Sequence, residues 1–197
     1  MLAALNCPSF NFMDTNTPLA SRYSRGAIAF HWIIAILIVF NFAAAFVAED
    51  LPKAEAIQVM GNHKAIGVTI LILSITRLLW RIAKPVPPLS VGLKAWEVTL
   101  AKVTHNLFYF LMIAIPASGW IMHSAFSAGK QIGFFGLFAY PGLPMAQDKP
   151  TGELFKEFHE VMAFAMLGLL ALHIAAALKH RYVDRYGSIW RMLPGRG

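Results

Sequence analysis

The sequence has little charge and almost no cysteine. Only 14% of its 197 residues are charged, whereas about a quarter are charged in a typical soluble domain. The single cysteine, Cys7, excludes an internal disulfide and a Cys-x-x-Cys-His site for covalent haem attachment. The sequence also lacks an internal repeat and a glycine-rich phosphate loop. Hydrophobic residues make up 57% of the chain and the mean hydropathy is +0.57, so we predict an integral membrane protein.

Four apolar segments are long enough to cross a hydrocarbon core, which requires about 20 residues. They cover residues 27–48, 63–81, 98–122 and 158–179 and predict an all-α bundle of four transmembrane helices. A fifth apolar segment, residues 132–140, is too short and is interrupted by glycines, so we expect an interfacial loop there. We expect a flexible tail over residues 1–22, followed by one membrane domain over residues 23–197.

The basic residues predict how these helices are oriented. Twelve of the 17 Lys and Arg residues lie in the N-terminal tail, between the second and third segments, or in the C-terminal tail. The positive-inside rule therefore places both termini in the cytoplasm. The same asymmetry explains the net charge of +7, so the charge gives no reason to expect a nucleic-acid partner.

Two histidines on the last apolar segment indicate the function most strongly. His159 and His173 are 14 residues apart, a spacing that returns to nearly the same face of a helix about 21 Å further along its axis. A histidine inside a membrane is costly to leave unpaired and usually marks a functional site. The spacing therefore predicts two stacked cofactors, one near each membrane surface.

The depth of the remaining histidines predicts a partner for each of these two. His31 and His173 each lie six residues from a basic residue at the cytoplasmic boundary, or about 9 Å along a helix. By the same measure, His63 and His159 both lie roughly 27 to 30 Å from that boundary. We therefore expect an inner pair, His31 with His173, and an outer pair, His63 with His159.

Paired imidazoles in a membrane are typical of haem ligation. One imidazole on each side completes six-coordinate haem iron and leaves no open position for oxygen, as in an electron carrier. We predict two non-covalently bound haem b groups with iron centres about 20 Å apart. Haem propionates seek basic partners. The candidates are Arg25, Arg77 and Arg81 at the inner haem and Lys64 at the outer haem.

The other histidines have different interpretations. His105 lies only three residues beyond Lys102 and has no partner at its depth, so we expect it to contact a quinone or a propionate rather than iron. His123 and His180 lie at helix ends, where an interfacial position is expected. For a single intramembrane histidine, a hydrogen bond to a neighbouring helix is the structural alternative, but four histidines in two depth-matched pairs favour ligation.

Several motifs, in this order along the chain, resemble the prokaryotic cytochrome b561 family. They are Tyr23-Ser24-Arg25 with His31-Trp32, Asn62-His63-Lys64 with Arg77-Leu78-Leu79-Trp80-Arg81, Gly119-Trp120-Ile121-Met122, Phe158-His159-Glu160, and Leu172-His173-Ile174 with Lys179-His180. The resemblance implies a four-helix, di-haem cytochrome of the bacterial inner membrane. The haem ligands of the family fall on His31, His63, His159 and His173, and the family also has a histidine at the position of His105.

This resemblance implies two alternative functions. One branch of the family is similar to a superoxide oxidase, an oxidoreductase that takes electrons from periplasmic superoxide and delivers them to ubiquinone in the membrane. Lysines on the outer side can attract the anion, although that side carries a net charge of −2, so the attraction has to be local. The alternative is a cytochrome b subunit that serves a partner dehydrogenase or hydrogenase. A histidine-lined metal transporter is disfavoured, because the spans lack cysteines and their one carboxylate, Glu160, lies at the outer end of the last span.

Overall fold

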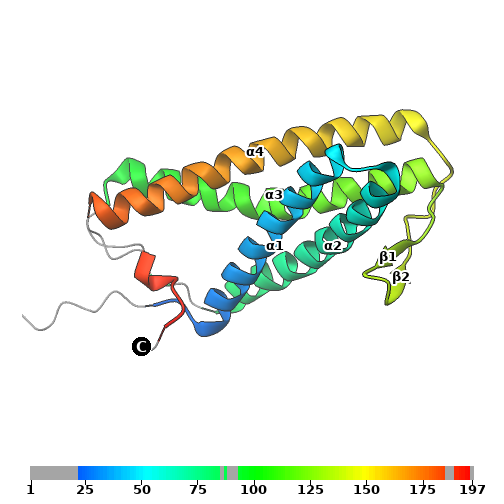
Figure 1. The fold of residues 1–197 in the computed structure, drawn as a ribbon. Helices are drawn as coiled ribbons and strands as arrows, with labels where there is room; N and C mark the ends of the chain where they lie inside the picture. Colours follow the sequence, from blue (N-terminus) through cyan, green and yellow to red (C-terminus); the bar gives the residue numbers. More distant parts are fainter. Residues whose placement is uncertain (1–21, 85–86, 88–92, 185–188, 196–197) are drawn as a thin grey trace, which may run out of the picture.

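The computed structural model describes residues 22–84, 87, 93–184 and 189–195, and within them the fold is a bundle of four long helices (Figure 1). The helices are α1 (Arg25–Asp50), α2 (Lys53–Ala83), α3 (Ala95–Ser127) and α4 (Lys149–Tyr182). Each is long and apolar enough to cross a membrane. The predicted all-α membrane fold is therefore confirmed. The expected tail, except for residue 22, lies outside the described residues, as do Cys7, Arg185 and Arg196.

The helices are longer than the apolar segments that predicted them. Helix α2 begins at Lys53 rather than at residue 63, and α4 begins at Lys149 rather than at residue 158. The added turns contain Lys and Glu residues, which favour water. Because the helices were predicted from apolar segments, these charged turns were not included. Helix α4 begins where the Asp148 side chain accepts a hydrogen bond from the backbone nitrogen of Thr151, an N-cap that fixes its first turn.

The four helices pack as two pairs that meet through α2 and α3. Helix α1 packs on α2, and α3 packs on α4, whereas no Cα atom of α4 comes within 8 Å of a Cα atom of α1 or α2 among the described residues. Between the pairs lies a small buried core, formed by Ile34, Ile70, Leu111, Met112, Met162 and Met166. We call the end of the bundle where α1 begins and α4 ends the terminal end, and the opposite end the hairpin end.

A β-hairpin at the hairpin end replaces the loop expected over residues 132–140. Strands β1 (Ile132–Phe134) and β2 (Phe138–Tyr140) pair in antiparallel register, and β1 packs against α2 (Figure 1). The turn places Phe135 and Gly136 in the left-handed region, at φ values of 50° and 75°. Such turns match the twist of a hairpin, and aromatic residues favour strands. The expectation of an irregular loop was therefore wrong.

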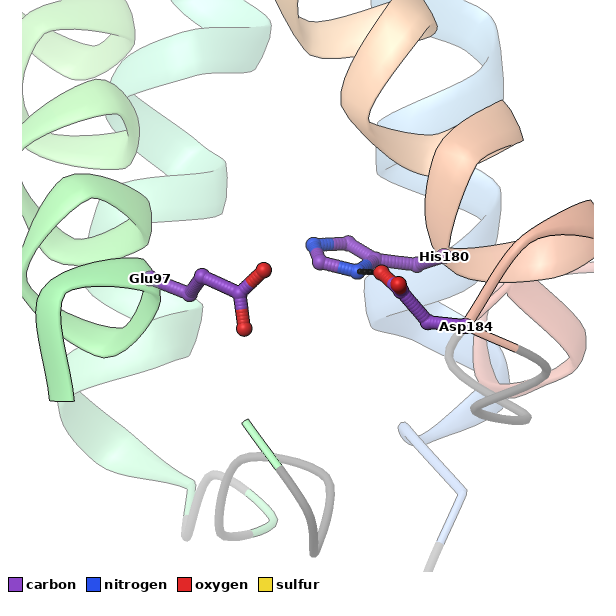
Figure 2. Close-up of side chains that lie close together, drawn as sticks. All are labelled: Glu97, His180 and Asp184. Carbon is purple, nitrogen blue, oxygen red and sulfur yellow. Dashed lines mark hydrogen bonds and ion pairs between the residues drawn. The ribbon is translucent and has the colours of Figure 1, made fainter. Parts of the chain in front are cut away.

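A cluster of charged side chains ties α3 to α4 at the terminal end, where Figure 2 shows Glu97 of α3 opposite His180 and Asp184. Lys179 Nζ lies 2.9 Å from Glu97 Oε1 and 2.6 Å from Asp184 Oδ2, and His180 Nδ1 lies 2.7 Å from the same Asp184 oxygen. Glu97 also accepts a hydrogen bond from the backbone nitrogen of Lys94 at the start of α3. The Lys179 ammonium thus occupies the centre of the cluster and bridges its two carboxylates.

Replacing Lys179 with methionine is expected to lower the melting temperature by a few degrees, because Glu97 and Asp184 would then lack their shared cation. Hydrogen bonds from Lys179 and His180 lower the pKa of Asp184. The stabilisation is therefore present at neutral pH and is lost as the pH falls through that lowered value. Thermal unfolding followed by circular dichroism should show a difference between wild type and K179M that shrinks in acid.

The matched control for this experiment is Lys156→Met, a change at an exposed lysine in the first half of α4 whose side chain makes no ion pair or hydrogen bond within the described part of the chain. An equal loss of melting temperature in K156M and K179M would contradict the role of the cluster.

Candidate functional site

One face of α4 carries both of the histidines that the sequence singled out. His159 and His173 lie 14 residues apart on this helix, and the buried Met166 lies midway between them. Seven residues make almost two helical turns, so the three side chains form one stripe along α4. We refer to the histidine pairs at the two ends of this stripe as the hairpin-side pair, His63 with His159, and the terminal-side pair, His31 with His173.

In each pair, two imidazole rings face one another across the bundle. The ring centroids are 6.3 Å apart in the hairpin-side pair and 6.4 Å apart in the terminal-side pair. Two metal–nitrogen bonds of roughly 2 Å, with roughly 1 Å from each nitrogen to its ring centre, give a separation of roughly 6 Å for imidazoles on opposite sides of one metal ion. Both pairs therefore have the spacing of two axial ligands.

Hydrogen bonds orient the two imidazoles of the hairpin-side pair. His159 Nδ1 lies 2.9 Å from the backbone oxygen of Ile115 and 3.1 Å from Ser118 Oγ, both on α3. His63 Nδ1 lies 3.1 Å from the backbone oxygen of Asn41 on α1. A carbonyl oxygen can only accept, so Nδ1 carries the hydrogen in both rings. This leaves the lone pair on Nε2, the arrangement usual for a metal-binding histidine.

A glycine on α3 provides the space in which the His159 ring lies. A Cβ atom added at Gly119 would stand 3.1 Å from His159 Cε1 and 3.3 Å from His159 Nδ1, closer than nearly all such contacts in proteins. Ser118 and Ile115 lie on the same stretch of helix and bind the same imidazole. The lack of a side chain at Gly119 therefore allows the ring to approach α3 closely enough to make these bonds.

The terminal-side pair has a different environment. Arg77 Nη2 lies 3.4 Å from His31 Nδ1, and the Phe108 ring stands against His173 with centroids 5.3 Å apart. A third histidine, His105, lies with its ring centroid 5.8 Å from that of His173. The prediction that His105 has no partner at its depth was therefore wrong. Its depth was counted from Lys102, whereas α3 begins at Ala95, so His105 lies ten residues into the helix.

Two of the three arginines proposed for propionate binding lie together near the terminal-side pair. The guanidinium carbons of Arg77 and Arg81 lie 5.7 Å and 5.6 Å from the centre of the Tyr109 ring. A pocket of about 30 Å³ is lined by these three side chains together with Tyr23, Ser24, Ala27, Trp80, Lys84 and Met192. Arg25, in contrast, is exposed and makes no hydrogen bond, ion pair or ring contact with the described residues.

At the hairpin end, Lys64 is linked to a histidine that the sequence argument treated as interfacial. Lys64 Nζ lies 3.3 Å from His123 Nδ1, and Ser127 Oγ lies 3.4 Å from His123 Nε2. In the described part of the chain, no carboxylate forms an ion pair with Lys64. A half-buried cation without a counter-ion therefore follows His63 directly in the sequence.

The C-terminal segment, residues 189–195, folds back onto the start of α1. Trp32 Nε1 donates a hydrogen bond of 2.7 Å to the backbone oxygen of Met192, and Arg22 Nη2 donates one of 2.7 Å to that of Leu193. Arg191 is buried and its guanidinium lies 5.5 Å from the centre of the Tyr23 ring. Nothing in the sequence pattern predicted this contact, which places the segment beside the terminal-side pair, because Trp32 adjoins His31.

Replacing Trp32 with phenylalanine is expected to release the C-terminal segment, because the ring is kept but the bond to the Met192 carbonyl is lost. The buried Arg191 would then be open to trypsin, and cleavage there should be several-fold faster than in the wild type. Timed proteolysis followed by intact-mass analysis measures this rate. Trp96→Phe, at an exposed residue on α3, is the control, and equal rates in the two variants would contradict the prediction.

Comparison with known proteins gives one consistent result. A family model described as prokaryotic cytochrome b561 matches residues 22–195. The chain is 30% identical to cytochrome b561 homolog 2 of Escherichia coli, over 91% of this chain and 94% of that protein. It is 28% identical to a probable superoxide oxidase CybB of Yersinia pestis, over 88% and 96% of the two chains. It is 26% identical to a cytochrome b562 of Cereibacter sphaeroides, over 88% and 96%.

Proposed function

Because the chain belongs to the prokaryotic cytochrome b561 family, we propose that its two histidine pairs hold two haem b groups and that it passes electrons from superoxide to ubiquinone. As a member of this family it is a haem-binding electron-transfer protein of the membrane. The observation that carries the proposal is the separation of 6.3 Å and 6.4 Å between paired imidazoles on helices whose backbones stand apart.

The choice of His31 rather than His105 as the partner of His173 follows from helix packing. Helices α3 and α4 pack directly on each other, so a macrocycle has no room between His105 and His173. The Cα atoms of α1 and α4 do not approach within 8 Å, whereas the His31 and His173 rings lie 6.4 Å apart, so these two side chains reach toward each other from separated backbones. His105 then lies beside the ligand, where it can contact a propionate or a quinone.

His31 with His173, and His63 with His159, would hold the two haem groups, which would supply one-electron transfer. The protein contributes orientation and charge. The bonds from His63 and His159 to backbone carbonyls hold each ring in one tautomer and make it a better electron donor to a metal. Arg77 and Arg81 would neutralise propionates at the terminal end, and Lys64 would do so at the hairpin end.

Superoxide is the donor best supported for the hairpin end. The relative from Yersinia pestis is named a probable superoxide oxidase, and Lys64 places a positive charge next to His63. A local cation raises the encounter rate of a small anion. Two superoxide anions lose one electron each and leave as dioxygen, and one ubiquinone takes up both electrons and two protons to become ubiquinol. We place the quinone near His105 and Arg77, at the terminal end, which faces the cytoplasm in this proposal.

Two measurements test this function in sequence. A reduced-minus-oxidised spectrum with haem quantified per chain should show two low-spin b-type haems, and a properly inserted protein that binds none would refute the cofactor assignment. Stopped-flow mixing with pulsed superoxide should then reduce the haem faster than superoxide dismutates. If the loaded protein shows no such reduction, superoxide is not the donor, and a partner dehydrogenase should be sought by co-purification.

A further inference from the structure

An apolar groove runs along the outside of the bundle, where α1 and α2 lie against the tip of the hairpin. Its volume is about 490 Å³, within the range of roughly 300–1,000 Å³ usual for ligand sites. Phenylalanine, leucine and alanine side chains of α1 line one wall, Val59 and Ile66 of α2 line the other, and Phe135 covers it from the hairpin. Every lining residue is apolar, so the groove suits a hydrocarbon chain.

The backbone at Phe135 is strained in a way that keeps this residue over the groove. Its φ of 50° lies in the left-handed region, where asparagine and glycine are the usual residues of such a hairpin turn. A bulky side chain there is unfavourable, and such outliers persist where the surrounding structure requires them. The Phe134 ring packs against Phe135 and Phe138, with centroids 4.8 Å and 4.7 Å apart, and so supports the cover.

The depth of the groove places it in the membrane. Val47 lies three residues before the end of α1 at Asp50, and Phe40 lies ten residues before it, or about 4.5 Å and 15 Å along the helix. A groove lined by both begins just inside the hairpin-end surface and extends into the hydrocarbon. What surrounds it at this depth is lipid.

The connection that bears the hairpin has the composition of a membrane interface. Residues 131–147 contain no charged side chain, and Leu137 and Phe138 at the tip are 79% and 58% exposed. At the base, Trp120 donates a hydrogen bond to the Pro141 carbonyl, and its ring stands edge-on to Tyr140. Burial raises the pKa of Tyr140 to about 12, so this residue also stays neutral. Trp and Tyr at such a position are typical of the headgroup level.

We propose that the groove between α1, α2 and Phe135 binds one acyl chain of a phospholipid from the hairpin-side leaflet, with the hairpin tip inserted at the headgroup–acyl boundary. A quinone has the same kind of tail, but its ring needs hydrogen-bond partners, and no polar side chain lines the groove. The proposal does not depend on haem binding or on the electron donor. Its consequence is that this chain retains a defined lipid when it is extracted from the membrane.

The first test fills the groove. Ala43 lies in its wall, and Ala43→Trp should occupy the space of the chain. Native mass spectrometry of the wild type, gently washed in detergent, should show a retained phospholipid, which A43W loses at least ten-fold while keeping its haem content. Ala165→Trp, at an exposed position on the lipid-facing side of α4, is the control. Retention of the phospholipid by A43W, or its displacement from the wild type by excess ubiquinone, would overturn the assignment.

The second test measures the depth of the tip. A nitroxide at Leu137→Cys, in a Cys7→Ser background reconstituted in phosphatidylcholine vesicles, should collide more with dissolved oxygen than with a water-soluble nickel chelate. Glu153→Cys, at an exposed position in the first turns of α4, gives the collision rates expected in water. Phe40→Cys gives the collision rates expected in hydrocarbon. Collision rates at position 137 equal to those at position 153 would overturn insertion of the hairpin.

Discussion

Replacing His159 with alanine is expected to reduce the haem content from two groups per chain to one. The hairpin-side pair would lose one of its two ligands, and His63 alone would face a space without a second imidazole. The terminal-side pair is expected to keep its haem, because His159 and His173 are about 21 Å apart along α4. Haem extracted and quantified per chain measures the loss directly.

Two further variants test which histidines are ligands at the terminal end of the bundle. His31→Ala should remove only the terminal-side haem, whereas His105→Ala should keep both, although the His105 ring lies closer to His173 than the His31 ring does. A protein that keeps two haems after loss of His159, or loses one after loss of His105, would contradict the assignment.

Replacing Gly119 with valine is expected to remove the hairpin-side haem without changing any ligand. A Cβ atom alone would stand 3.1 Å from the His159 ring, and the two additional methyl groups of valine have to enter the space that the imidazole fills. The ring would be pushed away from Ile115, and its bond to that carbonyl would be lost. The expected result is about one haem per chain, as in H159A, with the helix content unchanged by circular dichroism.

A glycine on the facing helix provides the control for this variant. Gly168 of α4 has no neighbouring atom within 4 Å of an added Cβ, so Gly168→Val should keep both haems. Gly119→Ala should give an intermediate result, because a displacement of a few tenths of an ångström relieves its contact. Full haem content in G119V would show that the position of His159 does not depend on this glycine.

The sequence predicted the helices and the histidine pairs because both can be recognised from numbers of residues counted along the chain. A stretch of about 20 apolar residues and an interval of 14 residues are properties of the chain itself, independent of packing. Depths counted from basic residues at the boundary also paired the four histidines correctly, but the depth counted from Lys102 was wrong. Lys102 was taken to mark the membrane surface, but α3 continues beyond it to Ala95, and His105 therefore lies deeper than expected.

The hydrogen-bond partners of the histidines, and the space that they occupy, could not be predicted from the sequence for a different reason. The groups that accept hydrogen bonds from His63 and His159 are backbone carbonyls of Asn41 and Ile115, and every residue has such a group. Only the packing of α1 on α2 and of α3 on α4 selects which carbonyls face the rings. Gly119 was visible in a family motif, but its role as the space for the His159 ring appears only in three dimensions.

The stripe on α4 also fixes the distance between the two histidines that it carries. Because His159 and His173 belong to one unbroken helix, the interval between the two sites is built into its covalent geometry. Thermal motion of α1 or α2 can weaken the contacts within either histidine pair, but it leaves the distance between His159 and His173 unchanged. A single residue inserted between the two would rotate one site by about 100° around the helix. Insertion or deletion of one residue there would therefore place the two histidines on different faces of α4.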